Sequence, residues 1–305
     1  MTKRSVDVPP AVRARIDRYV DSVDDRLAGP EPTAEVVQEV LADLHGDADA
    51  YERWRAGESI RPVERIRLDR YDPRNVLVKA DEWAETDESA LREAKSIKWL
   101  WAGFDASPAA NDLAFALPFR QMLATHLFAE AGEDLFLERG ITFPCGHNIE
   151  MGDRTVVHRN VLLDDRGALS IGDRVSIADG ATIHSHGHDV VDQTDVSIYL
   201  TELEDDVRIA SDAMVAAGCR VGENAMVGAK GIVRGDVPAH HIAVGAPAKS
   251  VRVKQGWKSV AADPGPLADR REQRRIEYEV PDDVEVVDEF QRDLSSPDSD
   301  GTTGD

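Results

Sequence analysis

Three histidines stand at alternate positions in the segment ATIHSHGHD, at His184, His186 and His188. A neutral imidazole, with an unperturbed pKa of about 6.5, can take a proton from a reacting hydroxyl near neutral pH. Imidazole nitrogens are also common zinc ligands. Because alternate residues of a strand share a face, all three rings could lie together. For His184 and His186, a neutral polar cluster on a solvated surface is the competing interpretation.

The residues around these histidines repeat with a period of six. The interior set is Met151, Val157, Leu163, Ile171, Ile177, Ile183, Leu203, Ile209, Val215, Val221, Val227 and Val233, and from Leu203 on a small or β-branched residue follows four positions after each: Val207, Ala213, Cys219, Ala225, Gly231 and Val237. This period matches neither a helix nor an amphipathic hairpin strand. It predicts a solenoid of short strands with a triangular coil, in which aliphatic residues fill the interior and small residues occupy the corners.

Two interruptions break the repeat. The segment DDRGALS (164–170) is interpreted as a hexad with a two-residue bulge. The segment DVVDQTDVSIYLTE (189–202) is interpreted as a loop inserted between coils. His188 therefore lies where the coil stops and the loop starts, which is an exposed position able to reach a cleft.

The flanking regions have other patterns. TAEVVQEVLADLH predicts a helix behind a cap at Thr33, and residues 113–132 predict a further helix or helix pair ending at Gly132, with Pro118 at a boundary. Trp99, Trp101 and Phe104 are expected to pack in a core or form a lid, with ligand stacking as the alternative.

We therefore expect a mainly β protein with three regions. These are a helical N-terminal region (1–137), a β-helix domain (138–255), and a C-terminal extension (256–305) that ends in a disordered acidic tail.

The composition is strongly acidic, with 58 Asp and Glu against 36 Lys and Arg and a formal net charge of -22. Such a surface is typical of halophilic proteins, and its field repels nucleic acid and anionic membranes at low salt. The chain has no apolar run of the ~18–20 residues that span a bilayer and no signal-peptide core, so we expect a cytoplasmic location. Cys145 and Cys219 are expected to be reduced, packed thiols.

The motifs of the repeat resemble those of the hexapeptide-repeat acyltransferases. They are IGDRVSIADGATI, HSHGHD, LEDDVRIASDAMVAAGCRVGENAMVGAKGIV and DVPAHHIAVGAPAKSVR, and the resemblance spans roughly Ile149 to Arg252. Within that family the chain is similar to galactoside, maltose and nodulation O-acetyltransferases and to polysaccharide-tailoring relatives. The resemblance implies a left-handed parallel β-helix, a homotrimer, and acetyl-CoA as co-substrate with no metal required.

The resemblance also assigns roles to residues. His188 matches the catalytic histidine and is the expected general base. Ser211 in RIASD matches a residue whose backbone amide stabilises the oxyanion, and Ala229 in VGAKG matches one whose backbone meets the pantetheine arm. The candidates for the coenzyme phosphates are Arg234, Lys249 and Arg252, with a solvated basic face as the alternative.

The acceptor side departs from the family pattern. His158 in VVHRN aligns with an acceptor-binding Asn of the family, Asn160 lies two residues further on, and His186 completes the expected acceptor-binding set. Arg208 stands where the family often has a Trp against the coenzyme arm. The predicted function is transfer of an acetyl or other acyl group from the coenzyme to a hydroxyl or amino group of a sugar or other small acceptor.

Two other functions fit the same fold. A γ-type carbonic anhydrase binds zinc through histidines of adjacent subunits, but its pair is spaced HxxxxH, whereas this chain has HxHxH. A non-catalytic assembly scaffold is the second alternative, since a fold does not dictate function. The presence of His188, Ser211 and Ala229 in register favours the enzyme.

Overall fold

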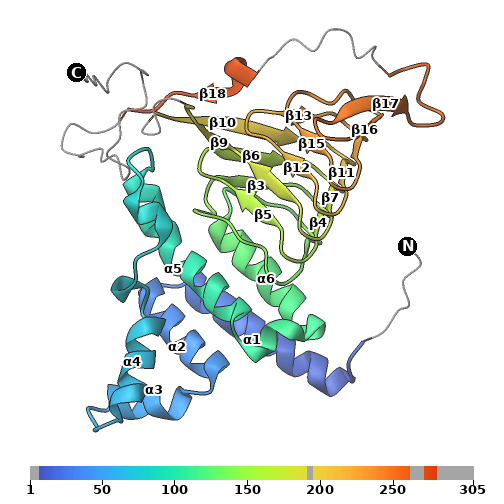
Figure 1. The fold of residues 1–305 in the computed structure, drawn as a ribbon. Helices are drawn as coiled ribbons and strands as arrows, with labels where there is room; N and C mark the ends of the chain where they lie inside the picture. The colour runs from blue at the N-terminus through green and yellow to red at the C-terminus, as the bar shows by residue number, and fades with distance from the viewer. Residues whose placement is uncertain (1–6, 191–194, 262–270, 280–305) are drawn as a thin grey trace, which may run out of the picture.

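The computed structural model describes residues 7–190, 195–261 and 271–279. A group of helices stands at one end of a stack of short parallel strands, as Figure 1 shows. The helices are α1 (Pro10–Ala28), α2 (Thr33–His45), α3 (Ala48–Arg55), α4 (Pro62–Tyr71), α5 (Glu88–Asp105) and α6 (Leu113–Leu127), with short 3-10 turns η1 (Pro73–Asn75), η2 (Lys79–Glu82), η3 (Pro108–Asn111) and η4 (Arg271–Arg274). The predicted acidic tail lies outside the described residues, and the division into three regions stays a prediction.

Two helix predictions need correction. The helix at Thr33 exists, but Thr33 is its first residue and Pro32 takes the cap position. Helix α6 ends at Leu127, not at Gly132, and Pro118 lies inside it. Proline removes one backbone donor, which costs about 3 kcal/mol or more in a helix interior. Burial of the flanking Phe119 and Leu123, both 0 % exposed, offsets that cost.

The strands form the three faces of a triangular coil. The first face holds β1 (Glu130–Ala131), β3 (Ile149–Met151), β6 (Ala168–Ile171), β10 (Val196–Leu203) and β13 (Arg220–Val221). The second holds β2 (Phe136–Leu137), β4 (Val156–Val157), β7 (Ser176–Ile177), β11 (Arg208–Ile209), β14 (Met226–Val227) and β16 (His241–Val244), with β17 (Lys249–Val253) antiparallel to β16. The third holds β5 (Leu162–Asp164), β8 (Thr182–His184), β12 (Met214–Val215) and β15 (Ile232–Val233). The predicted solenoid is thus confirmed.

The hexad register fixes what lies inside the coil. Every aliphatic residue of the predicted interior set is buried, and so is Cys219 among the small residues at the corners. Corner residues such as Asn160, Asp212 and Lys230 adopt positive φ near 57°. Asn and Asp tolerate this left-handed conformation better than most residues, because their short side chains bond locally.

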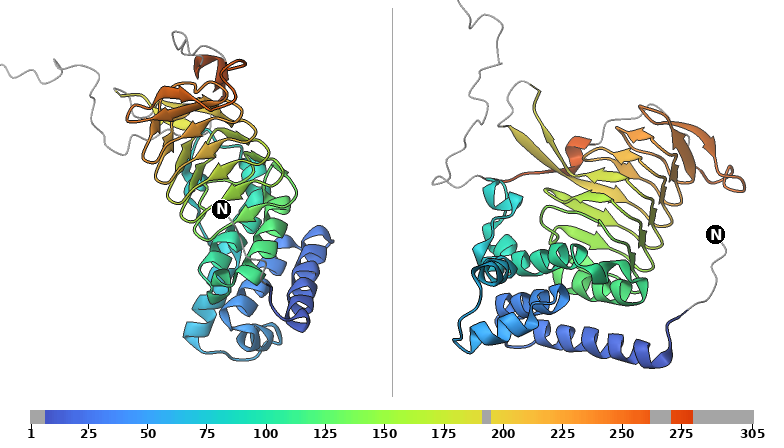
Figure 2. Two further views of the ribbon diagram at one scale, coloured as in Figure 1. Left: turned by 90° about the vertical axis from the view of Figure 1, so that its right-hand side faces the viewer. Right: turned by 60° about the horizontal axis from the view of Figure 1, so that its bottom comes forward.

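The segment predicted as a loop (189–202) is a strand from Val196 on, and residues 191–194 lie outside the described residues. Strand β9 (His186–His188) pairs antiparallel with the start of β10, and β10 then continues into the first face of the coil. Val196, Ile198 and Tyr199 are buried, which explains why the segment forms a strand. We call β9 and the Val196–Tyr199 part of β10 the hairpin arm. It projects beside the coil in the right-hand view of Figure 2, and β18 (Arg275–Ile276) pairs with it.

The helices close the first turn of the coil, and one core continues from them into it (Figure 2). Arg120 donates to the carbonyl oxygen of Leu137, and Trp101 donates to that of Ile141. Trp101 and Phe104 are both buried in this core. The prediction that these aromatic residues pack in a core is confirmed for Trp101 and Phe104. The indole N–H of Trp99 donates to the Arg70 carbonyl oxygen.

Candidate active site

The three histidines lie at the corner between the third and first faces, which we call the histidine corner. His184 ends β8, and His186 and His188 lie in β9, the first strand of the hairpin arm, where His188 pairs with Val196. His184 and His186 are partly exposed and His188 is exposed. The rings of His186 and His188 meet edge to face, with centroids 5.4 Å apart. An imidazole there can exchange a proton with a ligand that approaches from solvent.

A carboxylate that sequence analysis did not single out lies behind these rings. Asp164, at the end of β5, is paired in register with His184 of β8. Its Oδ2 accepts from His186 Nδ1 at 2.5 Å and from His184 Nδ1 at 3.3 Å. Burial opposes ionisation of Asp164, but the two histidine hydrogen bonds outweigh it and hold its pKa well below the usual range. The site therefore contains an ionised, buried acid.

The predicted bulge at 164–170 carries this acid. The Ser185 hydroxyl donates to the Asp164 carbonyl oxygen at 2.5 Å and accepts from Gly167 N at 2.8 Å, which ties the bulge to the next coil. A Cβ on Gly167 would lie 2.5 Å from the Tyr199 carbonyl oxygen, so only glycine fits. The bulge thereby fixes the backbone on both sides of the acid.

The N-terminal region reaches the same corner. Arg166, in the bulge, forms an ion pair with Glu85, and both side chains are almost completely buried. The Arg166 guanidinium also lies 4.3 Å from the ring centroid of Trp83. Residues between η2 and α5 thus form one wall beside the histidine corner.

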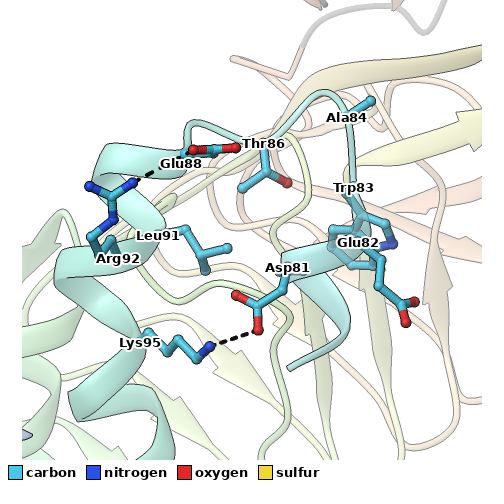
Figure 3. A pocket seen from close by; sticks show the side chains of 10 residues that line it. Asp81, Glu82, Trp83, Ala84, Thr86, Glu88, Leu91, Arg92 and Lys95 are labelled. Carbon is cyan, nitrogen blue, oxygen red and sulfur yellow. Dashed lines mark hydrogen bonds and ion pairs between the residues drawn. The ribbon is translucent and has the colours of Figure 1, made fainter. Parts of the chain in front are cut away.

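A pocket of about 330 Å³ opens between η2 and α5. In Figure 3, Trp83 and Leu91 contribute apolar surface, and the Lys95–Asp81 ion pair closes one side at 2.8 Å. None of the residues predicted for the site lines it.

The coenzyme candidates Ser211 and Ala229 lie at a different corner, between the second and third faces, which we call the Ser211 corner. Backbone hydrogen bonds stack its turns: Gly180 N donates to Arg159 O, Asp212 N to Asp179 O, and Lys230 N to Ser211 O, each at 3.0 Å. Ser211 and Ala229 are exposed in successive turns. Their corner and the histidine corner are the two edges of the third face.

His158 and Asn160 belong to the Ser211 corner two turns earlier. His158 Nδ1 is 2.8 Å from Glu138 Oε2, and Asn160 is exposed with φ 58°. Within one chain, the third face therefore separates these two acceptor candidates from His186.

The three basic candidates do not converge either. Arg234 follows β15 at the edge of the third face that also carries His184, because Val233 and Ile183 both pair with Val215. In β17, Lys249 pairs with Val244 and Arg252 with Ile242, which places both on the second face. All three are exposed, and no described carboxylate lies within ion-pair distance of them. Each can bind phosphate, but no single chain gathers them into one site.

Three further observations concern the described residues alone. No three His, Cys, Asp or Glu side chains among them are arranged to hold a metal ion. None of their helices is both long and apolar enough to cross a membrane. Cys145 and Cys219 are buried free thiols, as predicted.

Register reasoning alone could have found Asp164. Leu163 and Ile183 hold equivalent interior positions one turn apart, so the residues that follow them, Asp164 and His184, must be neighbours. The contact with His186 has no such signal, because it depends on how the chain turns into β9. The Glu85–Arg166 contact joins two regions and leaves no pattern in either.

Comparison with known proteins agrees with this fold. No protein-family model matches the chain. The galactoside O-acetyltransferase of Escherichia coli is 29% identical over 137 residues, covering 44% of this chain and 68% of that protein. A probable acetyltransferase of Mycobacterium tuberculosis is 31% identical over 131 residues, or 40% of this chain and 43% of that protein's length.

A solved structure of a related protein has the same fold. A galactoside acetyltransferase in complex with coenzyme A superimposes with a TM-score of 0.50 and 25% identity, over 55% of this chain and 84% of that one. The coil is thus the left-handed parallel β-helix of the hexapeptide-repeat class. By sequence and fold, the chain is related to the hexapeptide-repeat acetyltransferases, with galactoside O-acetyltransferases among its relatives.

Proposed function

We propose that this protein transfers an acetyl group from acetyl-CoA to a hydroxyl group of a sugar or another small acceptor, with His188 as general base. The observation that carries the proposal is the position of His188. It is exposed at the end of β9, in the hairpin arm beside the third face, on a β-helix related to galactoside O-acetyltransferases. An amino group on the acceptor would follow the same chemistry.

The proposed reaction is a direct transfer. His188 takes the proton of the acceptor hydroxyl as its oxygen attacks the thioester carbonyl carbon. The backbone N–H of Ser211 stabilises the negative charge that develops on the carbonyl oxygen. The carbon–sulfur bond then breaks, the thiolate of coenzyme A leaves, and the protonated imidazole returns the proton to it. No metal and no covalent enzyme intermediate are needed.

The separation of the two corners supports a site formed by two subunits. His188 at one corner can face Ser211 and Ala229 of a neighbouring copy, since the two edges of the third face point away from each other. A closed ring of identical subunits makes such heterologous contacts with no unpaired surface. We therefore propose a homotrimer with acetyl-CoA between adjacent coils.

The remaining candidates take roles in this arrangement. Ala229 contacts the pantetheine arm, and the three exposed basic side chains, Arg234, Lys249 and Arg252, neutralise the coenzyme phosphates from two subunits. His158, Asn160 and His186 bind the acceptor. For His158, the hydrogen bond between Nδ1 and Glu138 leaves Nε2 for a ligand.

We propose a cytoplasmic, halophilic protein. The net charge of -22 supports the halophilic proposal, because such a charge favours solubility in high salt. The two buried free thiols support the cytoplasmic proposal, because disulfides are rare in the cytoplasm.

The test is release of coenzyme A from acetyl-CoA in high salt, for the wild type and His188→Ala, across sugars, sugar nucleotides, serine and amines. We expect acceptor-dependent release, and a loss of about 10²–10⁴-fold in His188→Ala, the range for removal of a general base. Asp153→Asn is the matched control, because its carboxylate only accepts a backbone N–H at another corner.

A fully active His188→Ala enzyme would disprove the role of the histidine. If the wild type neither releases coenzyme A nor binds acetyl-CoA, the proposed function is wrong, and the scaffold and zinc alternatives are then the next to test.

A further inference from the structure

Asp164 bonds directly to His184 and His186 at the histidine corner. It is 3 % exposed, and its Oδ2 accepts from two ring nitrogens, at 2.5 Å from His186 and 3.3 Å from His184. By these distances His186 is the principal partner. Since a charge buried without partners is costly, the two imidazoles and the acid stabilise one another's positions.

The hydrogen bonds determine where the protons lie. A carboxylate only accepts, so His184 and His186 both carry their proton on Nδ1 when neutral. The Nε2 atom of His186 is then an acceptor directed away from the acid. The His186 ring lies edge to face with His188, with centroids 5.4 Å apart, which restricts how the His188 ring can turn.

The acid itself is held rigidly. Its backbone oxygen accepts from the Ser185 hydroxyl, between the two histidines in sequence, and β5 pairs with β8 on the adjoining turn. The Oδ1 atom accepts a long hydrogen bond of 3.5 Å from the backbone N–H of Arg166. The Arg166 side chain forms an ion pair with Glu85. No Lys or Arg side chain is shown bonding to the acid among the described residues, so its charge acts on the two histidine rings.

We propose that Asp164 is a positioning residue of the transferase, which acts through His186 to fix the ring orientation of His188. This inference rests on the proposed function and deepens it. It assigns His186 a task within the protein besides contact with the acceptor. A carboxylate that orients an imidazole through Nδ1 is a general way to prepare the other ring nitrogen for chemistry.

Two variants and their combination test the proposal. Asp164→Asn keeps the shape of the side chain and removes its charge. In His186→Asn, the amide nitrogen stands near the former Nδ1 and still donates to Asp164, but the ring that faces His188 is gone. We expect each variant to lower kcat at least tenfold while KM for acetyl-CoA changes less than twofold. Asp153→Asn, on the same turn of the coil, controls for loss of a carboxylate.

The double variant distinguishes positioning from a structural role. If Asp164 acts through His186, the double variant loses no more than the worse single variant, because contacts in one chain of interactions are not additive. Losses in kcat that multiply, or an Asp164→Asn enzyme with kcat within twofold of the wild type, would overturn the proposal.

Nitrogen NMR of histidine-labelled protein gives a readout that does not depend on activity. At a pH where the rings are neutral, we expect both to carry the proton on Nδ1 in the wild type, and in Asp164→Asn we expect the His186 signal to show both tautomers. A wild type with His186 protonated on Nε2 would contradict the inference even if the transferase is real. Conversely, a protein with the expected tautomers and no coenzyme A release would show that only the proposed function has failed.

Discussion

At the scale of single residues, Asp165 is as unusual as its neighbour Asp164. It is 0 % exposed, and its carboxylate accepts the backbone N–H groups of Cys145 at 2.8 Å and Gly146 at 2.5 Å. Burial raises the pKa of Asp165 to about 6, although these hydrogen bonds oppose the rise. Two adjacent acids in one bulge thus have pKa values moved in opposite directions.

We predict that Asp165 makes stability depend on pH between about 4 and 6. Because its pKa is raised in the folded state, its contribution is complete below the unfolded pKa and is lost as the pH rises through about 6. A rise from 3.8 to about 6 corresponds to about 3 kcal/mol at most. Relative to Asp165→Asn, the wild type should lose stability over this range, measured as denaturation midpoints at fixed salt. Parallel midpoints for both proteins from pH 4 to 7 would refute the prediction.

Sequence alone predicts some residues of the candidate site and not others. His188 could be found because its motif is local and the repeat marks where the coil ends. Asp164 reaches His186 across a turn of the solenoid, and this contact depends on how the chain turns into β9. The partnership of Arg166 with Glu85 joins residues of two regions, so spacing could not predict it.

At the scale of elements, the junction between helices and coil contains a buried cation. Arg120 in α6 is 0 % exposed, pairs with Asp105 of α5 at 2.5 Å, and donates to the Leu137 carbonyl oxygen at 3.2 Å. Its guanidinium also lies 5.0 Å from the ring centroid of Phe104. Helices α5 and α6 and the first turn of the coil are therefore joined by the side chain of Arg120.

We predict that Arg120→Met destabilises the protein by about 3–5 kcal/mol, because it leaves the mostly buried carboxylate of Asp105 without its cation. Denaturant unfolding at constant protein concentration measures this. The control is Arg139→Met, which removes an exposed guanidinium that also bonds near Asp105, and should cost about 1 kcal/mol or less. Equal losses in the two variants would show that the buried ion pair adds nothing.

Elements built on the hexad could be predicted because each turn repeats one rule, as the burial of Ile183, Val215 and Val233 shows. The hairpin arm could not, since its strands β9 and β10 pair with each other before rejoining the repeat. The predicted end of helix α6 and the predicted boundary at Pro118 were wrong for a similar reason. Its end is determined by strand β1 pairing with β3, and its proline is tolerated because the surrounding side chains are buried.

At the scale of the whole molecule, one chain holds both halves of the proposed site but does not bring them together. The histidine corner and the Ser211 corner are opposite edges of the third face. In a cyclic trimer every interface could join one half from each of two neighbours. A site formed by two subunits therefore predicts an experimental result that a site within one chain could not give.

Mixed trimers of two inactive variants should regain activity. His188→Ala removes the base, and Ala229→Trp fills the exposed corner proposed for the pantetheine arm. When the two are refolded together in equal amounts, each mixed trimer contains one interface in which both halves are intact. Random assembly then predicts about a quarter of wild-type turnover, measured as coenzyme A release. Each variant refolded alone is the control. If the mixture stays as inactive as its components while light scattering shows trimers, the site lies within one chain and the proposed arrangement is wrong.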